Sequence, residues 1–153
     1  AKHAHAQEIL KGQLHTPAFR REYLAVCLGA PEPPAGAVDA PLGPKPGSLV
    51  EQMVRPDGKA ARTRYETLAV HKDRALLRLE LDTGRTHQIR VHMAHLGHPL
   101  AGDFLYGTED RALIPRPALH SWKLSLCHPI TGETMTFTAP MPADMLGLLQ
   151  ERK

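Results

Sequence analysis

The sequence predicts an α+β fold in which a mixed, mostly antiparallel β-sheet carries a few helices. Two pairs of strand-like segments are the main evidence. Residues 62–70 and 75–81 are rich in strand-forming side chains and are separated by a short polar turn. Residues 123–127 and 134–138 flank a turn that contains Gly132. Each pair is typical of an antiparallel hairpin, because short turns of this kind join neighbouring antiparallel strands.

The remaining segments complete a single predicted domain that spans residues 1–153. Residues 22–28 alternate in polarity, which predicts one more strand. Residues 3–14 and 143–150 carry apolar side chains at helical spacing and are predicted to be helices. Residues 30–47 contain six prolines, which lack the backbone N–H that a strand or helix interior needs. This stretch is therefore predicted to be a long loop rich in proline and glycine within the domain.

Composition sets limits on the kind of protein. The 153 residues are 42% hydrophobic and 23% charged, which suits one soluble core. The net charge of +3 allows a polyanionic partner without requiring one. Cys27 and Cys127 lie in apolar strand-like runs, which is typical of reduced thiols in the cytoplasm or an organellar matrix. No apolar run approaches the roughly 20 residues of a membrane span, so we expect no membrane association.

The stretch from residue 81 to residue 107 has the composition of a functional segment. It contains two arginines, four histidines and several glycines around a short apolar run. Ile89, Met93 and Leu96 recur at helical spacing, which predicts a helix over residues 86–96 with Thr86 as its N-cap. Gly97 suits the left-handed position that follows such a helix. Arg85 and Arg90 lie near the start of this helix, where free backbone amides attract anions.

The four histidines of this segment raise an alternative, a metal-dependent hydrolase. His92, His95 and His98 are spaced by three residues, and imidazole is a common ligand of zinc. However, His98 lies beyond Gly97 and no carboxylate ligand accompanies the three side chains. We therefore expect no metal site, and we expect His87 and His92 to form hydrogen bonds within the fold.

Several motifs resemble those of the RluA-type pseudouridine synthases of ribosomal and transfer RNA. The strongest is TGRTHQIRVHMAHLGHPLAGDFLYG at residues 83–107. AKHAHA at the start, REYLAV at residues 21–26, GKAARTRYE at residues 58–66 and ALHSWKLSLCHPITGE at residues 118–133 occur in the family's order. The resemblance implies the pseudouridine synthase catalytic fold and the isomerisation of a uridine in structured RNA, either rRNA or tRNA. It further implies a monomeric enzyme, when complete, that needs no cofactor.

The family's nucleophile has no counterpart among these residues. In the family it is an aspartate in an HRLD-type motif, which precedes the segment equivalent to the start of this chain. No HRLD occurs in the 153 residues, and Asp103 matches a separate, structural position of the family pattern. We therefore expect the chain to be the C-terminal part of a catalytic domain and to be inactive alone. A non-catalytic RNA-binding module is the alternative.

The resemblance also assigns roles to individual residues. Tyr23 matches the tyrosine that stacks on the flipped uracil and is a candidate for proton removal at C5. Arg90 matches the arginine that pairs with the nucleophilic aspartate. The positions matched as structural parts of the motif are Thr83, Gly84, His87, Gln88, His92, Gly97, Gly102 and Asp103.

Basic side chains outside the pocket are candidate RNA contacts. Lys59, Arg62 and Arg64 lie close together beside a glycine turn, although a solvated hairpin face would have the same composition. Arg85 is either a phosphate ligand or a brace for the turn through backbone carbonyls. The sequence leaves these alternatives open for all four residues.

Overall fold

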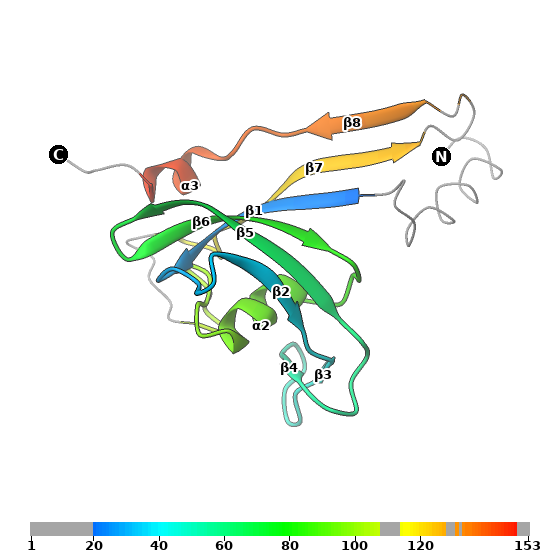
Figure 1. The fold of residues 1–153 in the computed structure, drawn as a ribbon. Coiled ribbons are helices and arrows are strands. Elements are labelled where there is room, and N and C mark those ends of the chain that lie inside the picture. The colour runs from blue at the N-terminus through cyan, green and yellow to red at the C-terminus, as the bar shows by residue number, and fades with distance from the viewer. Residues whose placement is uncertain (1–19, 108–113, 128–130, 132, 150–153) are drawn as a thin grey trace.

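The described residues form a six-stranded antiparallel sheet with one helix packed on each face (Figure 1). The computed structural model describes residues 20–107, 114–127, 131 and 133–149. The predicted helix over residues 3–14 and the predicted turn residue Gly132 lie outside this part. No helix in the described part is long and apolar enough to cross a membrane.

The strands follow the order β2-β5-β6-β1-β7-β8 across the sheet. Their bounds are β1 Arg20–Leu28, β2 Ala35–Asp39, β5 Arg62–His71, β6 Arg74–Leu81, β7 Leu119–Cys127 and β8 Thr134–Thr138. Both predicted hairpins are present, as β5 with β6 and β7 with β8. Within the described residues all of the strand pairings are antiparallel, so the sheet is not mixed there.

The prediction that residues 30–47 form one long loop is wrong. This stretch contains β2 and also β3 (Leu42–Pro44), which pairs with β4 (Gln52–Val54) in a small separate hairpin. The prolines permit this because they lie before β2, between β2 and β3, at the last residue of β3 or after it. In addition, β2 is an edge strand and needs hydrogen-bond partners on only one side.

Helices α2 (Gln88–His95) and α3 (Ala143–Gly147) cover opposite faces of β1. Ala25 and Cys27 of β1 belong to the core cluster that includes Met93 of α2, whereas Val26 belongs to the cluster that includes Met145 of α3. Successive side chains of a strand point to opposite faces, so both faces of this central strand are buried. Burial raises the pKa of the Cys27 thiol to about 11, which leaves it an unreactive packing group.

Helix α2 begins two residues later than predicted. His87, in a left-handed conformation with φ of 55°, is the N-cap residue in place of Thr86, and it makes no side-chain capping bond. The end of the helix agrees with the prediction. Gly97 has φ of 93°, its N–H donates to Ala94, and the N–H of His98 donates to Met93 at 2.9 Å. This pair of bonds is a Schellman motif, which turns the chain sharply after the helix.

Gly102, in the loop after α2, occupies a position that a larger residue could not take. Gly102 has φ of 75°, and a Cβ at this position would collide with the carbonyl oxygen of Arg116. Only glycine therefore fits there. Helix α3 ends at Gly147, earlier than the predicted helix over residues 143–150, whose last residue lies outside the described part.

Candidate active site

A pocket at the start of α2 brings together the two residues that the resemblance marks as catalytic. It has a volume of about 320 Å³ and is lined by Tyr23, Leu81, Arg85, His87, Gln88, Ile89, Arg90 and Leu119. Tyr23 comes from β1, Leu119 from β7, and the other residues from the end of β6, the following turn and α2. The volume lies at the lower end of the roughly 300 to 1,000 Å³ typical of small-molecule sites. Tyr23 and Arg90 thus approach the same cavity.

Arg90 is held in this pocket by Asp103. Its Nε and Nη2 atoms donate to the two carboxylate oxygens of Asp103 at 3.0 and 2.8 Å. This is the bidentate geometry that arginine, but not lysine, can form. The Arg90 side chain is 13% exposed and that of Asp103 is fully buried. The third nitrogen, Nη1, makes no hydrogen bond with the described residues. Asp103 therefore fixes the guanidinium and leaves Nη1 available to another partner.

Asp103 also organises the loop that follows it. One of its carboxylate oxygens accepts hydrogen bonds from the backbone N–H groups of Leu105 and Tyr106, both at 3.1 Å. The family resemblance predicts a structural role for Asp103 and does not predict its contact with Arg90. The structure shows one buried carboxylate that performs both tasks, since it caps the loop and orients the arginine.

Two aromatic residues complete the surroundings of Arg90, and the sequence does not single them out. The guanidinium carbon lies 5.4 Å from the ring centre of Phe104 and 5.2 Å from that of Tyr106. The Tyr106 hydroxyl is 2.7 Å from Nδ1 of His87 and accepts a hydrogen bond from the backbone N–H of Gln52. The available signal is the pair of rings in the DFLYG part of the motif, which follow the arginine-binding aspartate directly.

Gln88 connects the turn before α2 with strand β5. Its side-chain oxygen accepts hydrogen bonds from the Thr83 hydroxyl at 2.8 Å and from the Arg85 backbone N–H at 3.0 Å. Its side-chain nitrogen donates to the Arg62 carbonyl and the Thr63 hydroxyl. Gln88 is buried, so this network fixes the position of Arg85 and the start of the helix relative to the sheet.

Gly84 lies close to the side chain of Arg21. A Cβ at Gly84 would lie 2.8 Å from Nη2 of Arg21. A larger residue at this position would have to displace the end of the flexible Arg21 side chain.

His92 is a fully buried structural residue of α2. Its Nε2 lies 2.9 Å from the carbonyl oxygen of Ala40, which can only accept, so Nε2 is the protonated nitrogen. Its Nδ1 then accepts a hydrogen bond from the Thr63 hydroxyl at 2.8 Å. Both ring nitrogens are used within the fold. Burial lowers the pKa of His92. Burial also lowers the pKa of His87, and the positive charge of Arg90 contributes to that shift.

These lowered pKa values predict that the fold loses stability in mild acid. A histidine whose pKa is lowered by folding binds a proton more readily in the unfolded chain. Its contribution is therefore fully present above the unfolded value of about 6.5 and is lost as the pH falls below it. We expect the urea midpoint to decrease between about pH 7.5 and about pH 5.5. His92→Gln should reduce this decrease, and an unchanged pH dependence in that variant would contradict the assignment to His92.

The metal-hydrolase alternative gains no support from the histidines. His92 has its two ring nitrogens engaged, His87 contacts Tyr106, and Nδ1 of His98 lies 3.0 Å from the Leu28 carbonyl oxygen. In the part of the chain that the structure describes, no group of three or more His, Cys, Asp or Glu side chains is placed to hold a metal ion.

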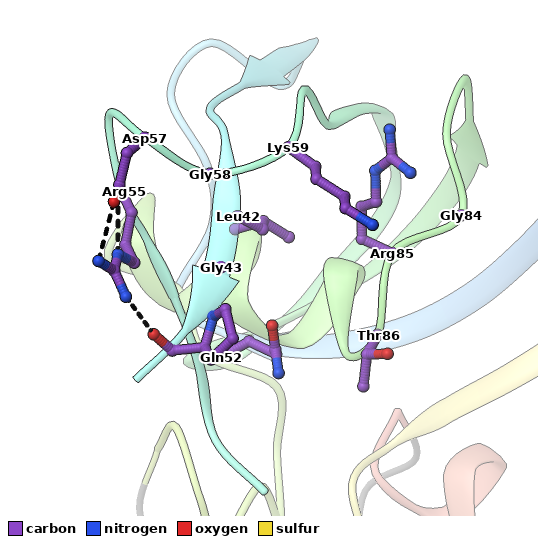
Figure 2. A pocket seen from close by; sticks show the side chains of 11 residues that line it. Leu42, Gly43, Gln52, Arg55, Asp57, Gly58, Lys59, Gly84, Arg85 and Thr86 are labelled. Atoms are coloured by element: carbon purple, nitrogen blue, oxygen red, sulfur yellow. Dashed lines mark hydrogen bonds and ion pairs between the residues drawn. The ribbon is translucent and has the colours of Figure 1, made fainter. Parts of the chain in front are cut away.

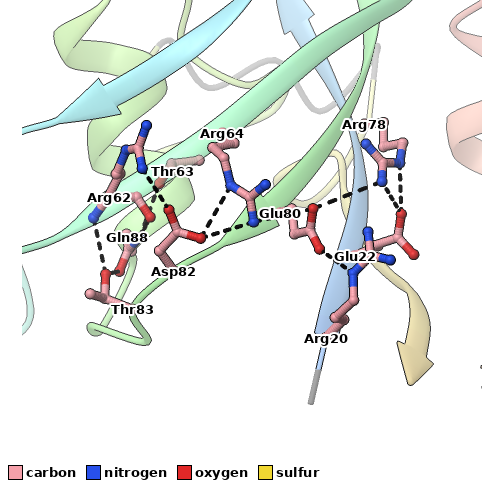
Figure 3. Close-up of polar contacts among 10 residues, drawn as sticks. All are labelled: Arg20, Glu22, Arg62, Thr63, Arg64, Arg78, Glu80, Asp82, Thr83 and Gln88. Atoms are coloured by element: carbon pink, nitrogen blue, oxygen red, sulfur yellow. Dashed lines mark hydrogen bonds and ion pairs between the residues drawn. The ribbon is translucent and has the colours of Figure 1, made fainter. Parts of the chain in front are cut away.

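The four candidate RNA contacts fall into two groups. Arg62 and Arg64 project from β5 into a network of ion pairs with Asp82 and Glu80 (Figure 3). Lys59 and Arg85 are exposed and form no ion pair with the described residues. Nε of Arg85 donates to the Ala60 carbonyl at 3.0 Å, which is the bracing role that the sequence left open.

Solved structures support the fold. The chain matches a human RNA pseudouridylate synthase domain containing 4 structure with a TM-score of 0.71 and 23% identity, covering 94% of this chain and 64% of that one. A second human structure, RNA pseudouridylate synthase domain containing 1, gives a TM-score of 0.72 with 24% identity over 88% of this chain. At this level of identity the likeness concerns the architecture alone.

Curated relatives are similar in sequence over nearly the whole chain. An uncharacterised RNA pseudouridine synthase of Bacillus subtilis is 47% identical over 98% of this chain and 53% of its own length. Ribosomal large subunit pseudouridine synthase D is 45% identical in Nitrosomonas europaea and 42% in Escherichia coli, over 46% and 50% of those proteins. This chain thus spans about half the length of its relatives. The family model for RNA pseudouridylate synthase matches residues 1–95, and the chain therefore belongs to the RNA pseudouridylate synthase family.

Proposed function

We propose that this chain forms the part of an RNA pseudouridine synthase that holds the target uracil and the arginine of the active site. The observation that carries the proposal is the shared pocket of Tyr23 and Arg90 beside helix α2. Family membership supports the reaction type, and the pocket supplies a place for a single base. No HRLD-type motif occurs in the 153 residues, so the proposal assigns the nucleophilic carboxylate to another segment of the enzyme.

The reaction rearranges one nucleotide without loss of atoms. The glycosidic bond between N1 and C1′ breaks, the uracil rotates, and a new bond joins C5 to C1′. The proton on C5 is then removed, and N1 gains a proton. The base must leave its stack to reach the enzyme, which calls for a platform on which it can rest. Tyr23 is the aromatic side chain that the pocket offers, and it is half-buried in the rigid strand β1.

Arg90 supplies the positive charge next to the reacting sugar. Asp103 occupies its Nε and Nη2 edge, which leaves Nη1 to meet the incoming nucleophilic carboxylate. A carboxylate paired with a guanidinium stays ionised and in a fixed orientation. The rings of Phe104 and Tyr106 lie against the guanidinium and help to fix its plane.

Ribosomal RNA is the first substrate class to test. Two of the relatives named above are ribosomal large subunit pseudouridine synthases, and we carry that substrate over to this chain as a proposal. The exposed basic side chains around the pocket suit a polyanion, whether rRNA or tRNA.

The test compares the chain with a longer version that includes an upstream HRLD-type segment. The longer protein should convert uridine to pseudouridine in large-subunit rRNA without added metal or cofactor, and the 153-residue chain should not. Tyr23→Phe keeps the ring but loses the hydroxyl, so it should still bind RNA and stall at proton removal from C5. Tyr23→Ala should also weaken RNA binding by the roughly 1 to 3 kcal/mol that base stacking contributes.

The readout is pseudouridine formation, measured by release of tritium from 5-tritiated uridine. Turnover by the 153-residue chain, or loss of the longer protein's activity on addition of a chelator, would overturn the proposal. Wild-type turnover by Tyr23→Phe would show that Tyr23 is a platform and not the base.

A further inference from the structure

A second pocket lies beside the turn that precedes helix α2, next to the pocket of Tyr23 and Arg90 (Figure 2). Its volume is about 500 Å³, and its walls are the β3–β4 hairpin, the turn that follows β4 and the turn before α2. The lining residues that carry charge are Arg55, Asp57, Lys59 and Arg85. Arg85 lines both pockets, so the two cavities meet at this side chain.

Only part of the positive charge in this pocket is balanced. Arg55 forms a bidentate pair with Asp57, with both bonds at 2.9 Å, and also donates to the Pro44 carbonyl. Lys59 and Arg85 have no carboxylate partner among the described residues. In Figure 2 the Lys59 side chain points toward that of Arg85. Two like charges converging on one cavity favour an anion between them.

Both cations are carried on backbone that is held in place. The N–H and carbonyl of Lys59 pair with the carbonyl and N–H of Leu42 at 2.8 and 2.9 Å. This close approach requires Gly58, because a Cβ there would lie 2.5 Å from the Leu42 oxygen. Nε of Arg85 is fixed by the Ala60 carbonyl, so its two terminal nitrogens remain for a ligand. Less side-chain freedom is then lost when an anion binds.

Arg62 and Arg64 differ from this pair in two respects. They alternate along β5 with Thr63, which contacts Gln88 and His92 of α2, so they project from the opposite face of the sheet. Their charges are also balanced, since Arg64 pairs with Glu80 and Asp82 and Arg62 pairs with Asp82.

We propose that Lys59 and Arg85 form a phosphate subsite that holds the RNA backbone next to the target uridine. The inference rests on the proposed function, because it takes the pocket of Tyr23 and Arg90 as the place of the flipped base. With the base in that pocket, the neighbouring phosphodiester reaches Arg85, and the strand continues into the second cavity past Lys59. Arg62 and Arg64 lie outside this path.

A matched pair of double variants tests the subsite. Lys59→Gln/Arg85→Gln and Arg62→Gln/Arg64→Gln each remove two positive charges from neighbouring segments. Binding of a fluorescein-labelled oligouridylate to the full chain is measured by anisotropy between about 50 and 200 mM KCl. The first variant should bind about tenfold more weakly, as expected for lost charge-assisted contacts, and its salt dependence should fall by about 0.7 per lost phosphate contact. The second should keep the wild-type salt dependence.

Thermal unfolding of each variant shows whether it is folded. All four substituted side chains are exposed, so both double variants should fold like the wild type. Equal losses of affinity in the two double variants would overturn the subsite, as would wild-type binding by Lys59→Gln/Arg85→Gln. The binding measurement needs no turnover. If the longer protein failed to make pseudouridine while the first variant still lost RNA affinity selectively, the proposed function would fail and the phosphate subsite would stand.

Discussion

Arg90→Ala in the longer protein is expected to lower the rate of pseudouridine formation by about 10²- to 10³-fold. In our proposal the guanidinium of Arg90 pairs with the nucleophilic carboxylate, and two hydrogen bonds to Asp103 fix its orientation. RNA affinity should change little, because the proposed phosphate subsite is formed by Lys59 and Arg85 and not by Arg90. Single-turnover rates at saturating RNA, together with the dissociation constant, separate the two effects.

The arginine also neutralises buried Asp103, so the variant's fold must be compared with a control. Arg116→Ala provides one, since Arg116 forms a similar fork with Asp144 on the surface at 3.1 and 2.8 Å. Arg90→Lys keeps a charge near Asp103 but loses the fork, and it should remain far below wild-type activity. A folded Arg90→Ala protein with turnover within a few-fold of the wild type would contradict the role of Arg90.

Local patterns explain why much of the fold could be predicted. The hairpin of β5 and β6 follows from strand-forming residues on both sides of a short polar turn. The end of α2 follows from Gly97, whose lack of a Cβ suits the left-handed position. The same local argument fails at the start of α2, where Thr86 has the side chain of an N-cap residue but His87 occupies the position. There the hydrogen bonds of Gln88 to the turn and to β5 determine where the helix begins.

Contacts between distant segments explain what the sequence did not reveal. The pairing of Arg90 with Asp103 depends on how the loop after α2 folds back, and no spacing rule links these positions. The sequence could have separated Arg62 and Arg64 from Lys59 and Arg85 only in part. Strand alternation places Arg62 and Arg64 opposite Thr63, but their acidic partners come from the neighbouring strand β6 and the residue after it. The burial of Asp103 and the ion pairs of Arg64 arise only when distant segments pack together, so local sequence patterns do not reveal them.

The substitution with the largest expected effect on stability is Asp103→Ala. It leaves the mostly buried Arg90 without its counter-charge and removes the acceptor for the N–H groups of Leu105 and Tyr106. Removal of one partner from a buried ion pair costs about 3 to 5 kcal/mol of unfolding free energy. Activity of the longer protein should fall as well, because among the described residues only Asp103 accepts hydrogen bonds from Nε and Nη2 of Arg90.

Asp144→Ala is the matched control, because it removes the same group from an exposed fork. The side chains of Arg116 and Asp144 are 38% and 37% exposed, against 13% and 0% for Arg90 and Asp103. Water and salt screen the exposed pair, so its loss should cost only about 0 to 1 kcal/mol. Urea unfolding of both variants at neutral pH gives the comparison. Equal losses of stability would mean that burial of Asp103 does not strengthen its hold on Arg90, and the positioning of the active-site arginine would need another source.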